Sequence, residues 1–347
     1  MKVISLFTGA GGLDLGFGRQ GFDIVWSNEF DSSIWPTLEV NFSNLRLDKR
    51  DITKIPTEQI PTADGIIGGP PCQSWSEAGA GRGIDDVRGK LFYDYVRILR
   101  AKQPKFFLAE SVPGILHTKN KAAFDNIIRL FESVGYSVVS RLVNANDYGV
   151  PQDRLRVIIV GYHMKLQKKF NFPAALPYKP NLRDAIWGMP SAQSTKASCK
   201  INDAGLTTPN HAFLQGSFSP IYMSRNRVRS WHEPSFTIQA GGRHIPIHPQ
   251  APKMRKIGTD KREFIPEYEM KYRRLSVREC AKIQTFPDDF IFQYESIENG
   301  YKMVGNAVPV RLAECLASAI AQDLSPSHTI MSLHSVLRNR LLARHSV

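Results

Sequence analysis

A chain of 347 residues, 42% of them hydrophobic, is long enough to bury a large core and to form two domains of ordinary size. The four cysteines (Cys72, Cys199, Cys280 and Cys315) are widely spaced and form no CxxC pair, which argues against a metal site and favours a reducing compartment. We see no secretory leader and no segment that approaches the length needed to cross a membrane. These features predict a cytoplasmic protein without a membrane segment or a metal ion.

The formal net charge of +13 suits a polyanionic partner, although high charge can also serve solubility alone. Between residues 181 and 274 the chain carries fifteen Lys and Arg against seven Asp and Glu. Because phosphate neutralisation is a common reason to cluster cations, this concentration favours a nucleic-acid surface in that segment.

In the first 165 residues, short apolar or β-branched runs alternate with longer amphipathic stretches, which predicts βαβ units and a parallel sheet. The expected strands are 3–6, 24–27, 65–67, 106–110, 137–142 and 157–162, and the expected helices are 13–19, 91–102 and 121–134. Gly135 follows the last of these helices as a stop signal.

Closely spaced prolines after residue 172 mark a change in character, and the segment to about 272 shows neither a repeat nor a long helical pattern. Helices are expected again after Ser276, which forms a capping-box pattern with Glu279, and over 310–322. We therefore predict an α/β domain from residues 1–180 and 298–347, with a smaller irregular domain at 181–297, hinge included, inserted between its two parts. After Asp323 the chain forms either a basic amphipathic helix or a frayed, solvated end.

Cys72 lies in the sequence GGPPCQSWSEAG, directly after a hydrophobic run expected to be a buried strand. Ligands gather at strand ends in open α/β sheets, and the prolines and glycines before Cys72 give a stiff backbone that a substrate can approach closely. This setting favours a catalytic thiolate over a cysteine that merely packs in the core.

The sequence FTGAGGLDLGF follows the first expected strand and opens the first expected helix, a position where backbone amides can crowd a ligand. Glu29 follows the next strand, where an acidic residue can bind ribose hydroxyls. Because the glycine spacing departs from GxGxxG, we expect an adenosyl ligand without a pyrophosphate rather than a dinucleotide.

Six segments occur in an order that resembles the cytosine-5 DNA methyltransferases: SLFTGAGGLDLGF, GGPPCQSWSEAG, AESVPGI, QDRLR, RRLSVRECAKIQTFPDDF and GYKMVGNAVPV. The resemblance extends from residue 2 to about 322. It implies a Rossmann-like S-adenosylmethionine-dependent methyltransferase domain with a mixed, mostly parallel sheet, and a smaller target-recognition domain. It also implies a prokaryotic, nucleoid-associated enzyme of a type II restriction-modification system.

The resemblance assigns four catalytic residues. Cys72 matches the nucleophile that adds to carbon 6 of cytosine, and Glu110 matches the acid at N3, for which we expect the apolar run before it to provide the surroundings. Arg156 matches the residue that holds the cytosine carbonyl oxygen, with Arg154 beside it on the same side of an extended segment, although a charged cluster at a sheet edge is the plainer alternative.

One position departs from the family pattern. The family usually has Asn after the catalytic Glu, whereas this chain has Ser111. Because that Asn is expected to fix the Glu rather than to contact carbon 6, the departure predicts slower turnover and not an inactive enzyme.

The same resemblance assigns the S-adenosyl-L-methionine site to ten residues: Phe7, Gly9, Gly11, Leu13, Glu29, Asp51, Ile52, Pro70, Asn306 and Val308. Asp51 would accept a hydrogen bond from the adenine amino group, although capping the next turn is an alternative role.

A cytosine stacked in a duplex cannot reach a thiolate, so the chemistry implies a flipped base in double-stranded DNA. The loop 74–83 is either a closing lid or an idle surface loop. For base reading we favour arginines of the irregular domain, with phosphate contact as the alternative for each: Arg225, Arg227, Arg229 and Arg243.

Stretches such as RGIDD, NANDYGV, MSRNRVR and HPQAP resemble family members that modify GGCC, which implies methylation of its inner cytosine. We further expect a monomer, and a cognate restriction endonuclease that acts on the same site. Two other classes stay open: an RNA cytosine methyltransferase with the same thiolate chemistry, and a catalytically idle DNA-binding regulator.

Overall fold

A computed structural model describes residues 1–70, 91–196 and 206–325. Within these ranges a seven-stranded sheet has the order β3-β2-β1-β4-β5-β7-β6, and β7 alone runs antiparallel to its neighbours. The sheet confirms the mostly parallel α/β fold and the six expected strands, and it adds the short β3. Its strands are β1 (Lys2–Leu6), β2 (Asp23–Asn28), β3 (Leu47–Asp48), β4 (Gly65–Gly68), β5 (Phe106–Ser111), β6 (Tyr136–Asn144) and β7 (Leu155–His163).

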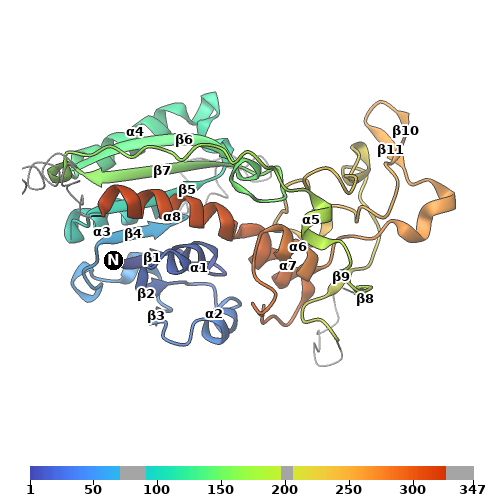
Figure 1. Cartoon of the computed structure of the whole chain (residues 1–347), viewed down its shortest axis with the longest axis horizontal. Helices are drawn as coiled ribbons and strands as arrows, with labels where there is room; N and C mark the ends of the chain where they lie inside the picture. Colours follow the sequence, from blue (N-terminus) through green and yellow to red (C-terminus); the bar gives the residue numbers. More distant parts are fainter. Residues whose placement is uncertain (71–90, 197–205, 326–347) are drawn as a thin grey trace, which may run out of the picture.

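Helices cover both faces of the sheet (Figure 1). On one face, α1 (Gly12–Arg19) and α8 (Val310–Leu324) bury Phe17 and Leu316 in a common core cluster. On the other face, α3 (Leu91–Lys102) and α4 (Lys121–Ser133) bury aromatic and aliphatic side chains against β4 and β5. The expected helices thus form, because their apolar positions recur at helical spacing and face the sheet.

The C-terminal helix packs directly on the first helix of the chain. A Cβ atom at Gly16 of α1 would lie 2.4 Å from the Cβ atom of Ala313 in α8, so only glycine permits this approach. The end of the described chain therefore completes the sheet domain.

The described residues between 182 and 272, which are 182–196 and 206–272, contain little regular structure. The elements of this segment are α5 (Leu182–Ile186), the paired strands β8 (Gln193–Thr195) and β9 (Ala212–Leu214), and the hairpin of β10 (Arg255–Gly258) and β11 (Lys261–Glu263). It has a small apolar cluster of its own, formed by Tyr222, Val228, Ile247, Ala251, Met254 and Tyr272. In Figure 1 this segment extends from one end of the sheet domain.

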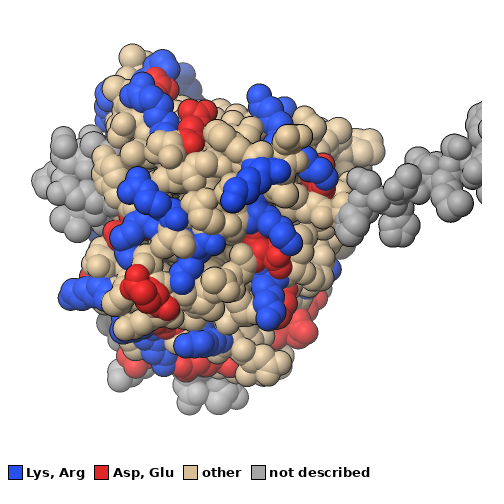
Figure 2. Space-filling view, turned by 90° about the vertical axis from the view of Figure 1, so that its left-hand side faces the viewer, with Lys and Arg blue, Asp and Glu red and all other residues tan. Residues whose placement is uncertain are grey.

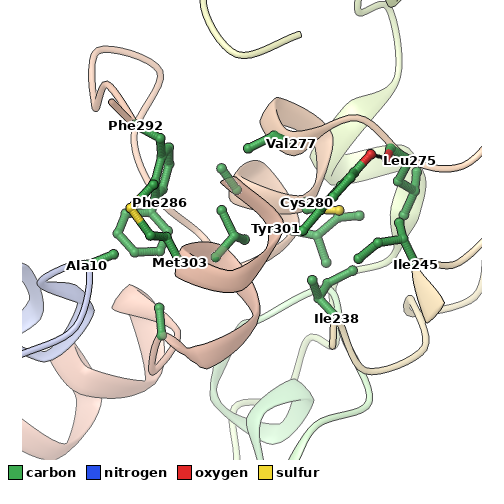
Figure 3. Packing of buried hydrophobic residues seen from close by; sticks show 14 of the residues in the cluster. Ala10, Ile238, Ile245, Leu275, Val277, Cys280, Phe286, Phe292, Tyr301 and Met303 are labelled. Atoms are coloured by element: carbon green, nitrogen blue, oxygen red, sulfur yellow. Dashed lines mark hydrogen bonds between the residues drawn. The ribbon is translucent and has the colours of Figure 1, made fainter. Parts of the chain in front are cut away.

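Two helices connect this segment with the sheet domain: α6 (Val277–Ile283) and α7 (Ile297–Asn306). The Ser276 side chain caps α6 in a capping box with Glu279, as the sequence predicts. The buried cluster in Figure 3 joins residues of both helices to Ala10 of the sheet domain and Ile238 of the irregular segment. Because this core is continuous, the division at residues 180 and 298 stays a prediction.

Short elements complete the described chain. The helix α2 (Trp35–Asn41) follows β2. The 3₁₀ turns are η1 (Ile52–Lys54), η2 (Thr57–Gln59), η4 (Pro113–Leu116), η5 (Thr118–Asn120), η6 (Ala145–Tyr148), η7 (Met164–Leu166), η9 (Tyr222–Ser224), η10 (Gly242–His244) and η11 (Pro266–Lys271). The helical tail suggested after Asp323 lies outside the described residues beyond 325.

The expectation that no segment approaches the length needed to cross a membrane needs correction. Residues 297–324 are apolar and long enough to cross a membrane if composition alone is considered. They form two helices, α7 and α8, interrupted at residues 307–309, and 72% of the most apolar stretch is buried in the protein. The apolar character is explained by packing in the core.

Candidate active site

A cavity of about 520 Å³ opens at the carboxyl ends of β1, β2, β4 and β5. This position is where open α/β sheets bind ligands, because the strands end there and the loops after them diverge. The wall is built from the turns after these strands, from η1, from Arg156 on β7 and from residues 302–308 around the end of α7.

Nine of the ten predicted cofactor residues line this cavity: Phe7, Gly9, Leu13, Glu29, Asp51, Ile52, Pro70, Asn306 and Val308. Gly11 does not line it. Gly11 is the N-cap of α1 with a φ of 79°, and a Cβ atom there would lie 2.6 Å from the ring of Phe42. Its role is to open the helix close to that ring, which only glycine can do without strain.

Glu29 is held in place by backbone amides. Its Oε2 atom accepts a hydrogen bond from Gly9 N and its Oε1 atom accepts one from Asp31 N, both 2.8 Å long. Burial raises the pKa of Glu29 above its ordinary value, and the two hydrogen bonds from backbone N–H groups offset part of that rise. The carboxylate is therefore fixed at the cavity wall before any ligand arrives.

Asp51 caps the first turn of η1 through Oδ1, which accepts hydrogen bonds from the backbone and hydroxyl groups of Thr53 at 3.0 and 2.8 Å. It also lines the cavity. Capping and ligand contact are thus compatible at this residue, because a carboxylate has two oxygen atoms.

Glu110 and Arg156 meet on the cavity wall. The Arg156 Nε atom lies 2.7 Å from Glu110 Oε1, and the two side chains are 12% and 10% exposed. The run of Phe106–Leu108 is buried inside the sheet, so the nearest partner of the carboxyl is a guanidinium rather than the expected apolar wall. A carboxyl and a guanidinium side by side can address two adjacent polar atoms of a planar ring.

Arg154 has a different environment from Arg156. It is fully buried, and its guanidinium donates to the carbonyl oxygens of Ile238, Gly305 and Ala307 over 2.7–3.0 Å. Burial lowers the pKa of Arg154 well below its ordinary value. It is not among the cavity-lining residues, so its contacts support a role in positioning and not contact with a substrate.

Cys72 and the loop 74–83 lie outside the described residues. Gly69 and Pro70, which precede Cys72, both line the cavity, and a Cβ atom at Gly69 would lie 3.3 Å from Glu110 Oε2. The last described backbone before Cys72 therefore passes beside the Glu110 carboxyl.

The four predicted DNA-reading arginines fall into two kinds. Arg225 and Arg243 are exposed. Arg227 donates to Tyr222 O and stacks over the ring of the same residue, and Arg229 forms ion pairs with Asp153 and Glu233. Arg225 and Arg243 are thus the better placed to reach a base.

Sequence reasoning missed several cavity residues, among them Phe30, Asp31 and Lys302. Phe30 is 67% exposed at the cavity, and Asp31 forms an ion pair of 2.5 Å with Lys302 of α7. Their adjacency to Glu29 was the available signal for Phe30 and Asp31. Nothing local in the sequence indicates Lys302, because its partner is 271 positions away.

Positive charge is not confined to the irregular segment. Figure 2 shows Lys and Arg side chains, with Asp and Glu among them, spread over the end of the molecule at the left of Figure 1. Charge alone therefore does not locate a DNA surface. Within the described ranges, no group of three His, Cys, Asp or Glu residues is arranged to hold a metal ion.

A sheet with helices on both faces and a cavity across its strand ends is a Rossmann-like α/β architecture. Solved structures with this fold include the Entamoeba histolytica methyltransferase EhMeth, with a TM-score of 0.69 at 17% identity over 94% of this chain and 99% of that one. The S. pombe Dnmt2 methyltransferase gives a TM-score of 0.65 at 18% identity over 94% and 100%.

Sequence relatives define the family. The C-5 cytosine-specific DNA methylase family matches residues 1–322. The type II methyltransferase M.MthTI of Methanothermobacter thermautotrophicus is 54% identical over 324 residues, which cover 93% of this chain and 98% of the relative. M.FnuDI of Fusobacterium nucleatum is 53% identical over 334 residues, which cover 95% and 97%.

The chain therefore belongs to the C-5 cytosine-specific DNA methylase family, as the motifs predict. It is a DNA cytosine-C5 methyltransferase of the type II class, whose members act on DNA and generally use S-adenosylmethionine.

Proposed function

We propose that this chain transfers a methyl group from S-adenosylmethionine to carbon 5 of a cytosine rotated out of duplex DNA, the inner cytosine of GGCC. The observation that carries the proposal is the Glu110–Arg156 pair, 2.7 Å apart on the wall of the same cavity that the predicted cofactor residues line. The reacting base and the methyl donor thereby share one cavity.

The cavity residues fit an adenosyl ligand. Glu29 offers a fixed carboxylate to ribose hydroxyls, and Asp51 offers one to an exocyclic amine. At about 520 Å³ the cavity is in the usual range of about 300–1,000 Å³ for small-molecule sites. The bound cofactor supplies the methyl group, and these residues bind and orient it.

At the base, Arg156 donates to the carbonyl oxygen and Glu110 provides the proton at N3. The carbonyl oxygen is attached to carbon 2, the ring neighbour of N3, so the two groups lie on one edge of the base, as the two side chains lie together on the cavity wall. The Cys72 thiolate would add to carbon 6 and convert the ring to an enamine whose carbon 5 takes the methyl group, with S-adenosylhomocysteine as the leaving group. Loss of the carbon-5 proton to a base and departure of the thiolate from carbon 6 would then restore the aromatic ring. Cys72 is two residues from Pro70, a span of at most about 7 Å of extended chain, so the thiol is within reach of this wall.

Base reading falls to the irregular segment. Arg225 and Arg243 are exposed, and a guanidinium fork binds the major-groove edge of guanine. The GGCC site is inferred from stretches such as MSRNRVR and HPQAP, which resemble family members that modify GGCC. The monomeric state, the nucleoid association and the cognate restriction endonuclease belong to the same proposal.

Bisulfite sequencing of plasmid DNA from cells that express the chain tests reaction and site together. We expect conversion of all cytosines except the inner ones of GGCC, and complete conversion with Cys72→Ser. Protection at another sequence would refute the site, and the same protection with Cys72→Ser would refute the thiolate mechanism. Methyl transfer to transfer RNA but not to duplex DNA would favour the RNA alternative.

A further inference from the structure

Three segments far apart in the sequence, around residues 152–154, 238 and 304–307, are joined by a buried polar cluster. We name it the glutamine–arginine cluster, and it consists of Gln152, Arg154 and Gln284. All three residues are fully buried. The Gln152 Nε2 atom donates to Gln284 Oε1 at 2.9 Å, and Gln152 Oε1 accepts from Ile238 N at 2.8 Å. Gln284 Nε2 donates to the carbonyl oxygens of Val304 and Ala307 at 2.8 and 3.2 Å.

Arg154 closes the cluster. Its two terminal nitrogens reach Ile238 O on one side and the Gly305 and Ala307 carbonyls on the other. The two bridged segments also touch directly, because a Cβ atom at Gly305 would lie 2.4 Å from the backbone of Gln239. Packing and hydrogen bonding therefore hold the same two segments together.

Each of the three segments leads to a functional surface. Two residues after Arg154, Arg156 pairs with Glu110 in the cavity. Residues 305–308 form part of the cofactor wall. Five residues after Ile238, the exposed Arg243 is proposed to read DNA. The glutamine–arginine cluster thus joins the segments that lead to the proposed sites of the base, the cofactor and the DNA.

These bonds are costly to break one at a time. A buried donor or acceptor that loses its partner costs about 1–3 kcal/mol, and more if it is charged. If the backbone at Ile238 moved away from residues 304–307, Gln152 and Arg154 would lose partners together. The segments are therefore expected to shift as one unit when a ligand binds to either side.

We propose that Gln152, Arg154 and Gln284 are positioning residues that couple DNA binding to cofactor binding. DNA that orders the segment around Ile238 also orders the cofactor wall at 305–308, and the reverse holds to the same degree because the coupling is reciprocal. This inference rests on the proposed function, since it takes S-adenosylmethionine and duplex DNA as the two ligands.

The test is a thermodynamic cycle with the intact chain, using S-adenosylhomocysteine so that no methyl transfer occurs. Its Kd is measured with and without saturating GGCC duplex, and the duplex Kd with and without S-adenosylhomocysteine. We expect each ligand to tighten the other by the same factor, about 5- to 150-fold. In Gln284→Met the factor should fall at least about twofold, because the bonds to Val304 and Ala307 are lost while the Arg154 bridge and both ligand surfaces stay intact.

Two further variants secure the result. Thr237→Val is milder: it removes the 2.6 Å bond from Thr237 Oγ1 to Asp153 O and should reduce the factor partially even if Gln284→Met does not fold. Asn210→Leu is the matched control, since it removes buried side-chain bonds to Phe292 and Arg278, and it should keep the full factor.

Full coupling in both Gln284→Met and Thr237→Val, or no coupling in the unaltered chain, would overturn the proposal. Failure of the proposed function gives a different result, namely no binding of S-adenosylhomocysteine or of duplex by itself.

Discussion

The cavity at the strand ends and the irregular segment at 182–272 are built in different ways. The cavity walls are turns at the ends of adjacent parallel strands, so the sheet places Glu29, Pro70 and Glu110 side by side. In its described part the irregular segment has two short pairs of strands, and arginine side chains hold it together by bonding backbone carbonyls. The first region depends on backbone regularity and the second on individual side chains, so single substitutions should affect them differently.

The largest effect is expected in the regular region, on catalysis. Glu110→Gln removes the proton for N3, and a positioned general acid contributes about 100- to 10,000-fold in rate. We expect the single-turnover rate of tritiated-methyl transfer to fall by that factor, while cofactor affinity in calorimetry changes less than about threefold.

The matched control for this prediction is Glu314→Gln. Glu314 is a largely buried carboxylate that pairs with Arg19 and Arg311 far from the cavity, so its loss should affect stability and leave the rate intact. Equal losses of rate in both variants would show that Glu110 acts only through the fold.

The second-largest effect is expected in the irregular segment, where a substitution should weaken duplex binding without changing cofactor binding. Arg274 is 3% exposed, donates to the carbonyls of Leu214, Gly216 and Ser217, and stacks 4.1 Å from the centre of the Phe218 ring. Hydrogen bonds to a charged group contribute about 1.5–3 kcal/mol. Arg274→Met should therefore raise proteolysis within residues 206–272 and weaken duplex binding at least about tenfold, with cofactor binding in the absence of DNA unchanged.

The opposite pattern is expected for Arg97→Met. The Arg97 guanidinium of α3 holds the carbonyls of Ile52 and Ile55, next to the cofactor wall. Its loss should weaken cofactor binding and leave duplex binding in the absence of cofactor unchanged. If Arg274→Met and Arg97→Met each weakened duplex binding and cofactor binding equally, the two ligands would not depend on separate regions of the protein.

The third effect concerns sequence reading. A bidentate arginine–guanine pair contributes about 1–3 kcal/mol of discrimination, so Arg225→Ala and Arg243→Ala should each reduce the preference for GGCC over a singly substituted site by about 5- to 150-fold. Competition binding with duplexes altered at one base pair measures this preference. A uniform loss across all sequences, with a shallower salt dependence, would assign the arginine to a phosphate instead.

The bounds of strands and helices in the regular region could be predicted from the sequence, whereas the side-chain contacts that hold the irregular segment could not. The reason is physical. A strand or helix is encoded by local periodicity, so β1, β5, α3 and α8 were all expected within a residue or two of their observed bounds. The cavity followed, because strand ends converge in such a sheet and nine of the predicted ligand residues line it.

The roles of Arg154 and Arg156 could not be separated from the sequence. They were expected to project to one side of an extended segment, yet Arg156 faces Glu110 whereas Arg154 bonds carbonyls 84 to 153 positions away. Such long-range contacts leave no local pattern. For the same reason the capping box at Ser276 was predictable, whereas the ion pair of Lys302 with Asp31 was not.

A smaller effect should appear with pH in the irregular segment. His248 is buried against the Trp231 ring, 3.5 Å from Glu279, and burial lowers its pKa to about 4. Because the unfolded state binds the proton more tightly, with a pKa near 6.5, the neutral ring stabilises the fold fully above that pH. This contribution is lost as the pH falls towards 4, by about 2 kcal/mol at pH 5.

Thermal unfolding at pH 7.5 and pH 5.0 checks this prediction through the difference between two proteins. Other groups, such as Asp14 with its pKa raised to about 7 by burial, titrate in both and cancel. The decrease in Tm on acidification should be larger in the unaltered chain than in His248→Gln. An equal decrease would mean that His248 does not carry the pH dependence.

The smallest effect is expected at Ser111, which is fully buried at the end of β5 and pairs with Val157, next to the Glu110–Arg156 pair. An asparagine there would offer an amide to fix Glu110, and one more hydrogen bond contributes about 0.5–1.5 kcal/mol. Ser111→Asn should therefore raise the methyl-transfer rate about two- to tenfold, measured in single turnovers, with Ser111→Ala as the variant that lacks the amide. A rate that stays the same or falls would indicate that this buried position cannot seat the larger side chain, and that the departure from the family pattern is compensated by packing around β5.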